Sequence, residues 1–478
     1  MPVRVEGSKN YARKHVMQTF IETNREEPAK EDVSRRVHNF EEIYRFFNDR
    51  KVARQAERCV QCGDPFCTTI GCPLGNYIPQ WLEAIAEKDL EKAFLLSNES
   101  SPFPEILGRI CPHNRLCEGA CTLEDGYGAI TIGPIEASIT DLAFAAGYTL
   151  PFPGITTGKK VAVVGSGPAG MSCAHFLLRA GIAVEMYERA HSPGGLLACG
   201  IPGFKLDKRI VARRFDILQA AGLTLHLNFE IGQDLPFSKL IDDYDAVFVG
   251  VGATNGKRAG IANEDHPHCF LAMEFLTNIQ QRLGEGGWME RFGVLGKRVV
   301  VIGGGDTAMD CVRTAVREGA QNVTCLYRRD AANMPGSSKE YANAVEEGVT
   351  FLFQAAPQRL VVDEHGRLVG VDAIRTQLGE ADAGGRQKIE EIPGTEHCVP
   401  ADVVIMALGF DIAGLPWLAD AGIELGRWGE VRVDPVSGVT AHPQVYAGGD
   451  CQRGADLAVT AAADGRRAAL AIMEQLLG

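Results

Sequence analysis

Residues Lys159–Arg189 read KKVAVVGSGPAGMSCAHFLLRAGIAVEMYER, and this stretch decides the fold class. An apolar strand, a glycine turn, an alanine-rich helix and a second strand follow one another within it. The same order returns in Gly296–Arg329, GKRVVVIGGGDTAMDCVRTAVREGAQNVTCLYRR. A strand, a Gly-x-Gly turn and a helix together form a βαβ unit that binds dinucleotides. The sequence therefore predicts an α/β protein with two Rossmann-like dinucleotide-binding domains.

The two units are predicted to be nested behind a cysteine-rich head. Asp245–Thr254 and Ala401–Phe410 both read as buried strands that can return the chain between domains. The tail after Val445 offers a strand, a Gly-Gly-Asp turn and a helix that starts near Leu457, and we expect it to pack on the first unit. The predicted domains are a helical one at 1–150, a first nucleotide domain at 151–285 plus 421–478, and a second at 286–420.

Composition excludes several classes of protein. The 478 residues are 45% hydrophobic and 23% charged, as in globular proteins, and the net charge of −13 argues against a nucleic-acid surface. No apolar run reaches the length of a membrane span. The first residues, MPVRVEGSKN, lack the apolar stretch of a secretory signal, so we expect a cytoplasmic protein. There, clustered thiols indicate metal binding rather than disulfides.

The first glycine turn carries the features of a nucleotide site. Gly165, Gly167 and Gly170 follow an apolar strand and open a helix, whose free N–H groups can bind a pyrophosphate. Glu188 ends the next strand, where a carboxylate can accept hydrogen bonds from ribose hydroxyls. The alternative is a structural turn with no ligand.

The second glycine turn differs at the end of its second strand. Gly303, Gly305 and Ala308 form a G-x-G-x-x-A turn, and Arg328 and Arg329 stand where an NAD site has an acid. Arginine matches the oxygens of a 2′-phosphate, which favours NADPH. The alternative is a solvated pair of arginines at a strand end.

Seven of the fourteen cysteines lie in the head, in two groups. They are Cys59, Cys62, Cys67 and Cys72, followed by Cys111, Cys117 and Cys121. A four-thiolate zinc site is the competing interpretation, but it uses two close pairs, and the chain has a single CxxC. Cys72 and Cys111 each precede a proline, and in two-cluster ferredoxins the cysteine before proline binds the other cluster. The pattern favours iron–sulfur clusters.

At this point the chain resembles the small (β) subunit family of bacterial NADPH-dependent glutamate synthase. The resemblance rests on ERCVQCGDPFC, GRICPHNRLCEGAC, GSGPAG, GGLLACGIPGFKL, GGGDTAMDCVR, YRRDAANMPGSSKEY and YAGGDCQRGADLAVTAAADGR. It runs from about residue 40 to the C-terminus. It implies FAD, NADPH and two 4Fe-4S clusters as cofactors. Related electron-input modules occur in dihydropyrimidine dehydrogenase and in bifurcating ferredoxin–NADP reductases.

The resemblance also implies site residues. It assigns to the first cluster Cys59, Cys62, Cys67 and Cys121, and to the second Cys72, Cys111, Cys117 and, as an unusual eighth ligand, Glu136. Glu136 otherwise reads as a surface or helix-capping acid. For FAD the implied residues are Gly165, Gly167, Pro168, Ala169, Gly170, Glu188, Gly195, Leu196, Lys205, Gly449, Asp450 and Thr460. For NADPH they are Gly303, Gly304, Gly305, Asp306, Thr307, Arg328, Arg329 and Gly409.

The implied function is electron input. Flavin exchanges both electron pairs and single electrons, so it belongs between NADPH and the clusters, and no catalytic acid or base is expected beyond cofactor placement. Met1 and Pro2 offer no cysteine nucleophile, so glutamine chemistry is expected in a large partner subunit that contains FMN and an iron–sulfur centre. The expected assembly is a hetero-oligomer. The same module could instead serve a pyrimidine reductase partner or ferredoxin, and a third possibility is a flavoprotein with a zinc-stabilised interaction head.

Overall fold

The computed structural model describes residues 19–284, 289–381 and 387–478. The N-terminal residues from which a cytoplasmic location and the lack of a cysteine nucleophile were predicted lie outside these ranges. Contacts divide the chain into one unit of Met1–Ala29 and Phe46–Leu150, and a second of Lys30–Arg45 and Pro151–Gly478. The segment Lys30–Arg45, predicted as part of the head, therefore belongs by its contacts to the nucleotide unit.

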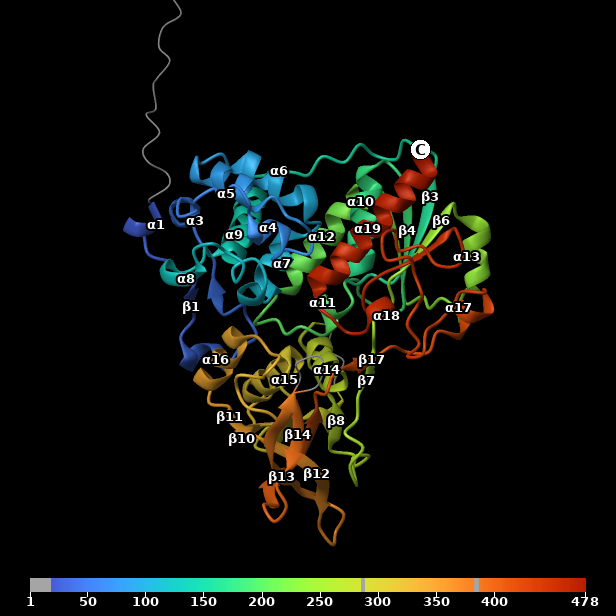
Figure 1. The fold of residues 1–478 in the computed structure, drawn as a ribbon. Coiled ribbons are helices and arrows are strands. Elements are labelled where there is room, and N and C mark those ends of the chain that lie inside the picture. Colours follow the sequence, from blue (N-terminus) through green and yellow to red (C-terminus); the bar gives the residue numbers. More distant parts are fainter. Residues whose placement is uncertain (1–18, 285–288, 382–386) are drawn as a thin grey trace, which may run out of the picture. The chain divides into compact units, whose positions relative to one another are not determined.

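The first unit is helical, as predicted (Figure 1). Its core contains Trp81, Phe94, Ile135 and Ile139, none of which is exposed. The chain between the helices Ile78–Ala86 and Leu90–Ser100 turns at Lys88, which has a positive φ. The helices are α1 (Thr19–Glu22), α3 (Asp49–Ala56), α4 (Phe66–Thr69), α5 (Ile78–Ala86), α6 (Leu90–Ser100), α7 (Pro104–Ile110), the 3-10 turn η2 (His113–Arg115), α8 (Glu124–Tyr127) and α9 (Ile132–Ala145).

The second unit contains two five-stranded parallel sheets. The first has the order β18-β6-β3-β4-β5. Its strands are β3 (Lys160–Val164), β4 (Ala183–Glu188), β5 (Leu223–Leu227), β6 (Ala246–Val249) and β18 (Val445–Ala447). Its helices are α10 (Pro168–Arg179), α11 (Leu196–Cys199), α12 (Lys208–Ala220), α13 (Phe237–Asp243), α17 (Pro416–Asp420), α18 (Asp450–Arg453) and α19 (Ala458–Leu477).

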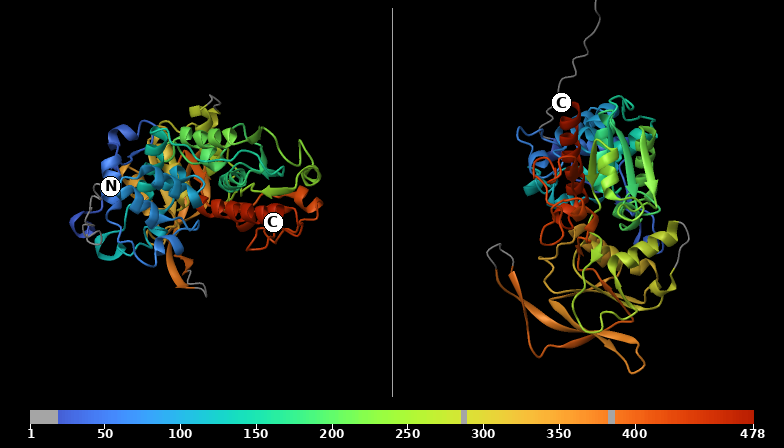
Figure 2. Two further views of the ribbon diagram at one scale, coloured as in Figure 1. Left: turned by 90° about the horizontal axis from the view of Figure 1, so that it is seen from above. Right: turned by 90° about the vertical axis from the view of Figure 1, so that its right-hand side faces the viewer.

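The predicted return of the C-terminal tail to the first sheet is confirmed. β18 pairs in parallel with β6, and α19 begins at Ala458, next to the predicted start. In the right-hand view of Figure 2, α19 (red) lies alongside this sheet. Close packing of α19 requires a glycine at 465, because a Cβ there would lie 2.0 Å from the carbonyl oxygen of Ala169 in α10.

The second sheet has the order β11-β10-β9-β16-β8. Its strands are β8 (Cys269–Leu271), β9 (Arg298–Ile302), β10 (Asn322–Tyr327), β11 (Thr350–Phe353) and β16 (Val403–Met406). Its helices are α14 (Ala272–Gly284), η3 (Glu290–Phe292), α15 (Asp306–Arg317) and α16 (Ser338–Glu346). The buried strands predicted at 246–249 and 403–406 are present as β6 and β16.

The strand pairing places the domain boundaries at other residues than the sequence predicts. β8 pairs with β16, so the second domain already includes residue 269, ahead of the predicted start at 286. Leu415 and Leu418 pack in the core of the first sheet, ahead of the predicted return at 421. Both differences arise because the connecting segments bury apolar side chains that carry no local domain signal.

The remaining strands form smaller sheets. An antiparallel sheet (Figure 2, orange) contains β12 (Ala355–Val362), β13 (Leu368–Ala381), β14 (Gln387–Glu391) and β15 (His397–Pro400). Two-stranded pairs join β7 (Asn255–Gly256) to β17 (Phe410–Asp411), and β1 (Ala29–Lys30) to β2 (Tyr44–Arg45), with α2 (Val33–Arg36) between β1 and β2 in the chain. Within the described ranges, no helix combines the length and apolar character that crossing a membrane requires.

Candidate functional site

The first glycine turn lies between the end of β3 and the start of α10. Gly165 has a φ of +96°, and a Cβ on Gly170 would lie 1.9 Å from the carbonyl oxygen of Gly165. At Gly167 a Cβ would meet no atom of the described residues within 4 Å. Pro168 and Ala169 then open α10. The turn therefore leaves open space at a helix N-terminus, which is the geometry that binds a pyrophosphate.

Glu188 is already held by this turn. The backbone N–H of Ser166 and its hydroxyl donate to Glu188 Oε2 at 3.0 and 2.6 Å, and the N–H of Ala190 donates to Oε1 at 2.8 Å. Glu188 is buried at the end of β4, where the sequence predicts contact with ribose. Ser166, which sequence reasoning did not single out, thus fixes the orientation of Glu188, the residue predicted to bind the ribose.

Two further segments approach the first turn. A Cβ on Gly195, at the start of α11, would lie 2.9 Å from the Cα of Gly167, and Leu196 follows as the first residue of that helix. On another side, the Cβ that Gly449 lacks would lie 3.0 Å from the Cβ of Ala169. The structure thus brings the predicted FAD residues of three distant segments to one turn.

The turn after β18 adds titratable and polar groups. Burial raises the pKa of Asp450 to about 7, although the backbone N–H of Asp456 donates to its carboxylate and opposes the rise. The Oε1 of Gln452 is buried and has no hydrogen-bond partner among the described residues, so a bound ligand could satisfy it. Thr460 lies in the first turn of α19 and donates to the carbonyl oxygen of Leu457 at 2.7 Å. These residues fit a flavin nucleotide.

Lys205 is placed differently from the other predicted FAD residues. Its Nζ lies 2.8 Å from Oδ1 of Asp310 in α15, and both side chains are nearly buried. Burial opposes the charge, but Asp310, Glu340 and Asp306 outweigh it and hold the pKa of Lys205 above its ordinary value. Its ammonium group therefore serves an ion pair with the helix that follows the second glycine turn.

The second glycine turn repeats the first at the end of β9. Gly303 has a positive φ, and Gly305 again faces open space among the described residues. The N–H of Gly336 donates to the carbonyl oxygen of Gly304 at 2.9 Å, and Asp306 Oδ1 accepts the N–H of Ser337 at 2.9 Å. The loop around Gly336, which the sequence analysis did not assign, thus closes on the turn, although its Pro-Gly pair is a turn signal.

Two other predicted NADPH residues lie at ends of elements of this domain. Thr307 is the second residue of α15. Gly409 follows β16 with a φ of +90°, and its carbonyl oxygen accepts the N–H of Lys257 at 2.9 Å. Both positions are compatible with a nucleotide at the carboxyl edge of the sheet.

The two predicted phosphate-binding arginines have different surroundings. Arg328 is exposed, and its carbonyl oxygen accepts the hydroxyl of Thr376 at 2.8 Å. Arg329 is half-buried, and its Nη2 donates to the carbonyl oxygen of Gln387 in β14 at 3.1 Å. Its buried Nε has no partner among the described residues. Arg328 is thus open to solvent, whereas Arg329 ties the antiparallel sheet to the end of β10.

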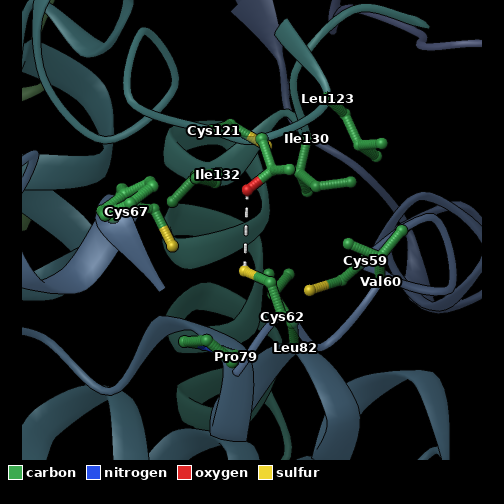
Figure 3. Close-up of a pocket in the computed structure, with 12 residues that line it drawn as sticks. Cys59, Val60, Cys62, Cys67, Pro79, Leu82, Cys121, Leu123, Ile130 and Ile132 are labelled. Atoms are coloured by element: carbon green, nitrogen blue, oxygen red, sulfur yellow. Dashed lines mark hydrogen bonds between the residues drawn. The ribbon is translucent and has the colours of Figure 1, made fainter. Parts of the chain in front are cut away.

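Four cysteines of the head line one pocket (Figure 3). They are Cys59, Cys62, Cys67 and Cys121, the set predicted for the first cluster. The hydroxyl of Thr122 donates to Cys62 Sγ at 3.7 Å and the Gln61 side chain donates to Cys59 Sγ at 3.5 Å. Burial raises the pKa of Cys59 to about 11 and that of Cys67 to about 12. Without a metal the thiols of Cys59 and Cys67 are protonated at neutral pH, so metal binding must release their protons.

Arg58 positions the first of these thiols. Its guanidinium group is buried and donates to the carbonyl oxygens of Thr23, Tyr127, Gly128 and Ala129 at 2.8–2.9 Å. The residue before Cys59 is thereby fastened to two loops far away in the chain. Sequence reasoning missed Arg58, because nothing local distinguishes it from a solvated arginine.

The second predicted ligand group is also brought together. Cys72, Cys111, Cys117 and Glu136 lie within electrostatic range of one another. A Cβ on Gly71 would lie 2.7 Å from the Cα of Cys117, so the segments that carry Cys72 and Cys117 touch.

The acid of this group is neither on the surface nor at a helix cap. Glu136 is buried within α9, and Asn76 Nδ2 donates to its Oε1 at 2.7 Å. Burial, followed by the charge of Glu105, raises the pKa of Glu136 to about 8.

The thiols surround spaces rather than single points. Across the described ranges, no three His, Cys, Asp or Glu side chains converge closely enough to hold one metal ion. Zinc needs all four sulfurs about 2.3 Å from a single ion, whereas a cubane spreads its ligands over four iron atoms. Four cysteines that line one pocket are a donor set that a 4Fe-4S cluster can use.

Comparisons with known proteins agree with this geometry. Residues 36–148 match the family model of dihydropyrimidine dehydrogenase domain II, 4Fe-4S cluster, and residues 159–465 match pyridine nucleotide-disulphide oxidoreductase. The glutamate synthase [NADPH] small chain of Escherichia coli K12 is 47% identical over 96% of this chain and 98% of its own length. The putative oxidoreductase AegA of the same strain is 47% identical over 95% of this chain and 70% of its own length.

A solved structure shows the fold alone. FprA from Mycobacterium tuberculosis, in complex with NADPH, superimposes with a TM-score of 0.55 at 21% identity. The match covers 66% of this chain and 84% of that one. The predicted fold class, an iron–sulfur head before Rossmann-like domains, is confirmed by this likeness together with the two family models.

Proposed function

The chain belongs to the family of the glutamate synthase [NADPH] small chain, and we propose that it is the electron-input subunit of a glutamate synthase. It is an oxidoreductase whose family matches support the predicted cofactors, FAD, NADPH and 4Fe-4S clusters. In the proposed role it oxidises NADPH and delivers electrons to a large partner subunit, which converts glutamine and 2-oxoglutarate to glutamate. One observation carries the proposal: four cysteines between residues 59 and 121 line one pocket, in a chain with two open glycine turns.

At the first turn, the residues would hold FAD. The N–H groups at the start of α10 face the open space at Gly167, where they can bind the pyrophosphate. Glu188, oriented by Ser166, offers a carboxylate to the ribose hydroxyls. Asp450, whose pKa burial raises to about 7, can hold a proton at its carboxyl group and would help to hold FAD from the turn after β18.

At the second turn, the residues would hold NADPH. The start of α15 faces the open space at Gly305, and Arg328 stands exposed at the strand end where the 2′-phosphate is expected. No side chain is assigned as a catalytic acid or base, because transfer between the two nucleotides requires placement rather than proton transfer by the protein.

The head would hold two 4Fe-4S clusters on the predicted ligands. When bound, FAD supplies two-electron chemistry with the nicotinamide and the clusters supply one-electron transfer. The protein contributes the thiols and carboxylate, their burial, and the donors of Gln61 and Thr122 that point at the sulfurs of Cys59 and Cys62. A cytoplasmic hetero-oligomer with an FMN- and iron–sulfur-containing large subunit completes the proposal.

A second candidate function is delivery of electrons from the same NADPH, FAD and iron–sulfur chain to an acceptor other than a glutamate synthase large subunit. The relative named a putative oxidoreductase matches at the same 47% identity as the glutamate synthase small chain and is longer than this chain. Identity of the input module therefore does not fix the acceptor, which a different partner or ferredoxin could provide.

The proposal is tested by co-expression with the large subunit from the same source and anaerobic purification of the complex. We expect about eight irons and about one FAD per chain, as two cubanes and one flavin require, and NADPH-dependent formation of glutamate from glutamine and 2-oxoglutarate. Stoichiometric zinc without iron and sulfide would refute the cluster assignment. A stable, iron-replete complex that makes no glutamate would favour another acceptor.

A matched pair of variants tests the electron route. Cys59→Ala should lose iron and glutamate formation, while NADPH still reduces the flavin in protein that retains FAD. Cys398→Ala, an exposed cysteine outside the head, should leave both unchanged. Normal glutamate synthesis by a folded, FAD-replete chain without clusters would contradict the route.

A further inference from the structure

The C-terminal helix α19 carries a buried carboxylate. Asp464 in α19 is 1% exposed. Its Oδ2 accepts the backbone N–H of Gly449 at 3.0 Å and Nε of Arg453 at 3.0 Å. Its Oδ1 accepts Nη2 of Arg453 and lies 3.0 Å from Nη2 of Arg467. A buried carboxylate is costly unless it is paired, so this arrangement needs its partners.

The partners of Asp464 belong to the turn that follows β18. Gly449 has a φ of +75°, in the left-handed region that favours glycine. A Cβ on Gly448 would lie 2.8 Å from the Cβ of Asp464, so the turn rests directly on α19. Asp450 follows immediately and begins α18, and Arg453 ends it. Asp464 thus accepts hydrogen bonds at both ends of α18, from Gly449 before its first residue and from Arg453 at its last.

The neighbour of Asp464 contacts the first glycine turn. A Cβ on Gly465 would lie 2.0 Å from the carbonyl oxygen of Ala169 and 3.1 Å from the backbone nitrogen of Cys173. The pair Asp464–Gly465 therefore joins α10, which opens at the first glycine turn, to the turn after β18. These are the two segments between which the flavin nucleotide is expected.

We propose that Asp464 is a positioning residue for FAD, which fixes the Gly449–Asp450 turn relative to the first glycine turn. This inference rests on the proposed presence of FAD but not on the identity of the electron acceptor. The backbone hydrogen bond sets the path of the turn, and the paired contacts with Arg453 set the direction of α18. Without them, Asp450 can still fold into place but is no longer held there before the flavin binds.

Two arginines lie beside the same carboxylate, and their side chains are similarly exposed, at 33% and 27%. Arg453 donates two hydrogen bonds to Asp464, whereas Nη2 of Arg467 approaches Oδ1 at 3.0 Å without forming a hydrogen bond in the described residues. Only Arg453 belongs to α18, next to Asp450. If Asp464 served only stability, Arg453→Gln should lower the unfolding free energy more than Arg467→Gln, because it removes two hydrogen bonds, but neither variant should change the flavin dichroism. If it positions the flavin turn, the two variants should differ in how they hold FAD.

The experiment measures FAD release from anaerobically purified holoprotein, through the rise of flavin fluorescence after dilution, together with the visible circular dichroism of bound flavin. We expect release about tenfold faster in Asp464→Asn, about fivefold faster in Arg453→Gln and within about twofold of the unmodified protein in Arg467→Gln. The flavin dichroism should change in the first two variants only. Iron content and 2′,5′-ADP binding should remain normal in all three, which shows that the rest of the chain is folded.

Equal FAD release and equal flavin dichroism in Arg453→Gln and Arg467→Gln would overturn the inference, and this pair decides it even if Asp464→Asn fails to fold. A holoprotein that holds FAD as described but makes no glutamate with any large subunit would contradict the proposed function and leave the positioning role intact. A chain that binds no FAD would refute both.

Discussion

The two parallel sheets have the same strand order, but they complete it from opposite directions along the chain. In both, the strand before the glycine turn is central, with β4 or β10 on one side and β6 or β16 on the other. The fifth strand is β18 in the first sheet, which comes from the end of the chain, and β8 in the second, which precedes the glycine turn. The second domain is thus inserted into the first, whose sheet is completed only by the C-terminal tail.

The difference in edge strand changes what surrounds each turn. β18 leads into Gly449 and Asp450, which approach the first glycine turn, whereas β8 leads directly into α14. At the ends of the second strands, Glu188 is buried against Ser166, while Arg328 is exposed and Arg329 is tied to β14. One local pattern therefore yields a site bordered by the C-terminal tail and another bordered by an inserted antiparallel sheet.

The two glycine turns should differ most in their response to substitution at the third motif position, Gly170 in the first turn and Ala308 in the second. Gly170→Ala places a Cβ against backbone atoms that cannot move aside, and we expect a loss of at least about 3 kcal/mol in unfolding free energy, with loss of FAD. The matched change at the second turn, Ala308→Gly, should cost only about 1 kcal/mol, the difference in helix propensity. Thermal denaturation and released flavin measure both. A mild effect of Gly170→Ala would show that the first turn is not as tight as the geometry indicates.

Replacement of the exposed Arg328 should give the next largest effect, and this effect should be confined to NADPH. Arg328→Gln should weaken the binding of 2′,5′-ADP by roughly 2 kcal/mol in free energy. This corresponds to a KM for NADPH about thirtyfold higher, with NADH use nearly unchanged. Calorimetry and steady-state kinetics measure these quantities. Arg367→Gln, which removes the same charge from an exposed turn of the same domain, is the control. Equal losses for NADPH and NADH would assign Arg328 a structural role instead.

Asp450 should make the stability of the folded chain depend on pH, because its carboxyl group is buried in the turn after β18. Burial raises its pKa from the ordinary 3.8 to about 7 in the folded chain, so the folded state binds the proton more tightly than the unfolded state. Its contribution therefore falls as pH rises from 4 through 7 and is constant above pH 8.

The measurement compares chemical denaturation of the FAD-free protein between pH 5.5 and 8.5. Asp450→Asn should gain about 1.5 kcal/mol relative to the unmodified protein across this range, a value reduced for the partial exposure of the side chain. Asp420→Asn, on an exposed helix end, should show no such gain. A constant difference between Asp450→Asn and the unmodified protein at every pH would rule out this explanation.

The smallest effect should come from the tied arginine. Arg329→Gln removes one hydrogen bond to the Gln387 carbonyl, which is worth about 1 kcal/mol, and should lower NADPH and NADH use equally. Limited proteolysis should show easier cleavage in β14. A loss confined to NADPH and as large as that of Arg328→Gln would mean that both arginines bind the phosphate, as the sequence alone suggests.

Local patterns predicted much of the molecule. The alternation of strand, glycine turn and helix depends on residues close in the chain, so both parallel sheets, the buried strands β6 and β16, and the start of α19 were predicted correctly. The density of cysteines likewise indicated a metal-bearing head without knowledge of the fold. Glycine positions were informative because a missing Cβ is a local requirement of the backbone.

What only the tertiary structure decided involves partners far apart in the chain. Sequence spacing cannot show that β8 joins the second sheet, that Lys205 pairs with Asp310, or that Arg329 contacts β14 rather than solvent. It also cannot reveal Arg58 or Asp464 as anchors, because a buried charged residue looks like an exposed one until its partners are known. These choices depend on which surfaces pack together, since the cost of burying a charge is offset only where folding brings its partners within hydrogen-bond distance.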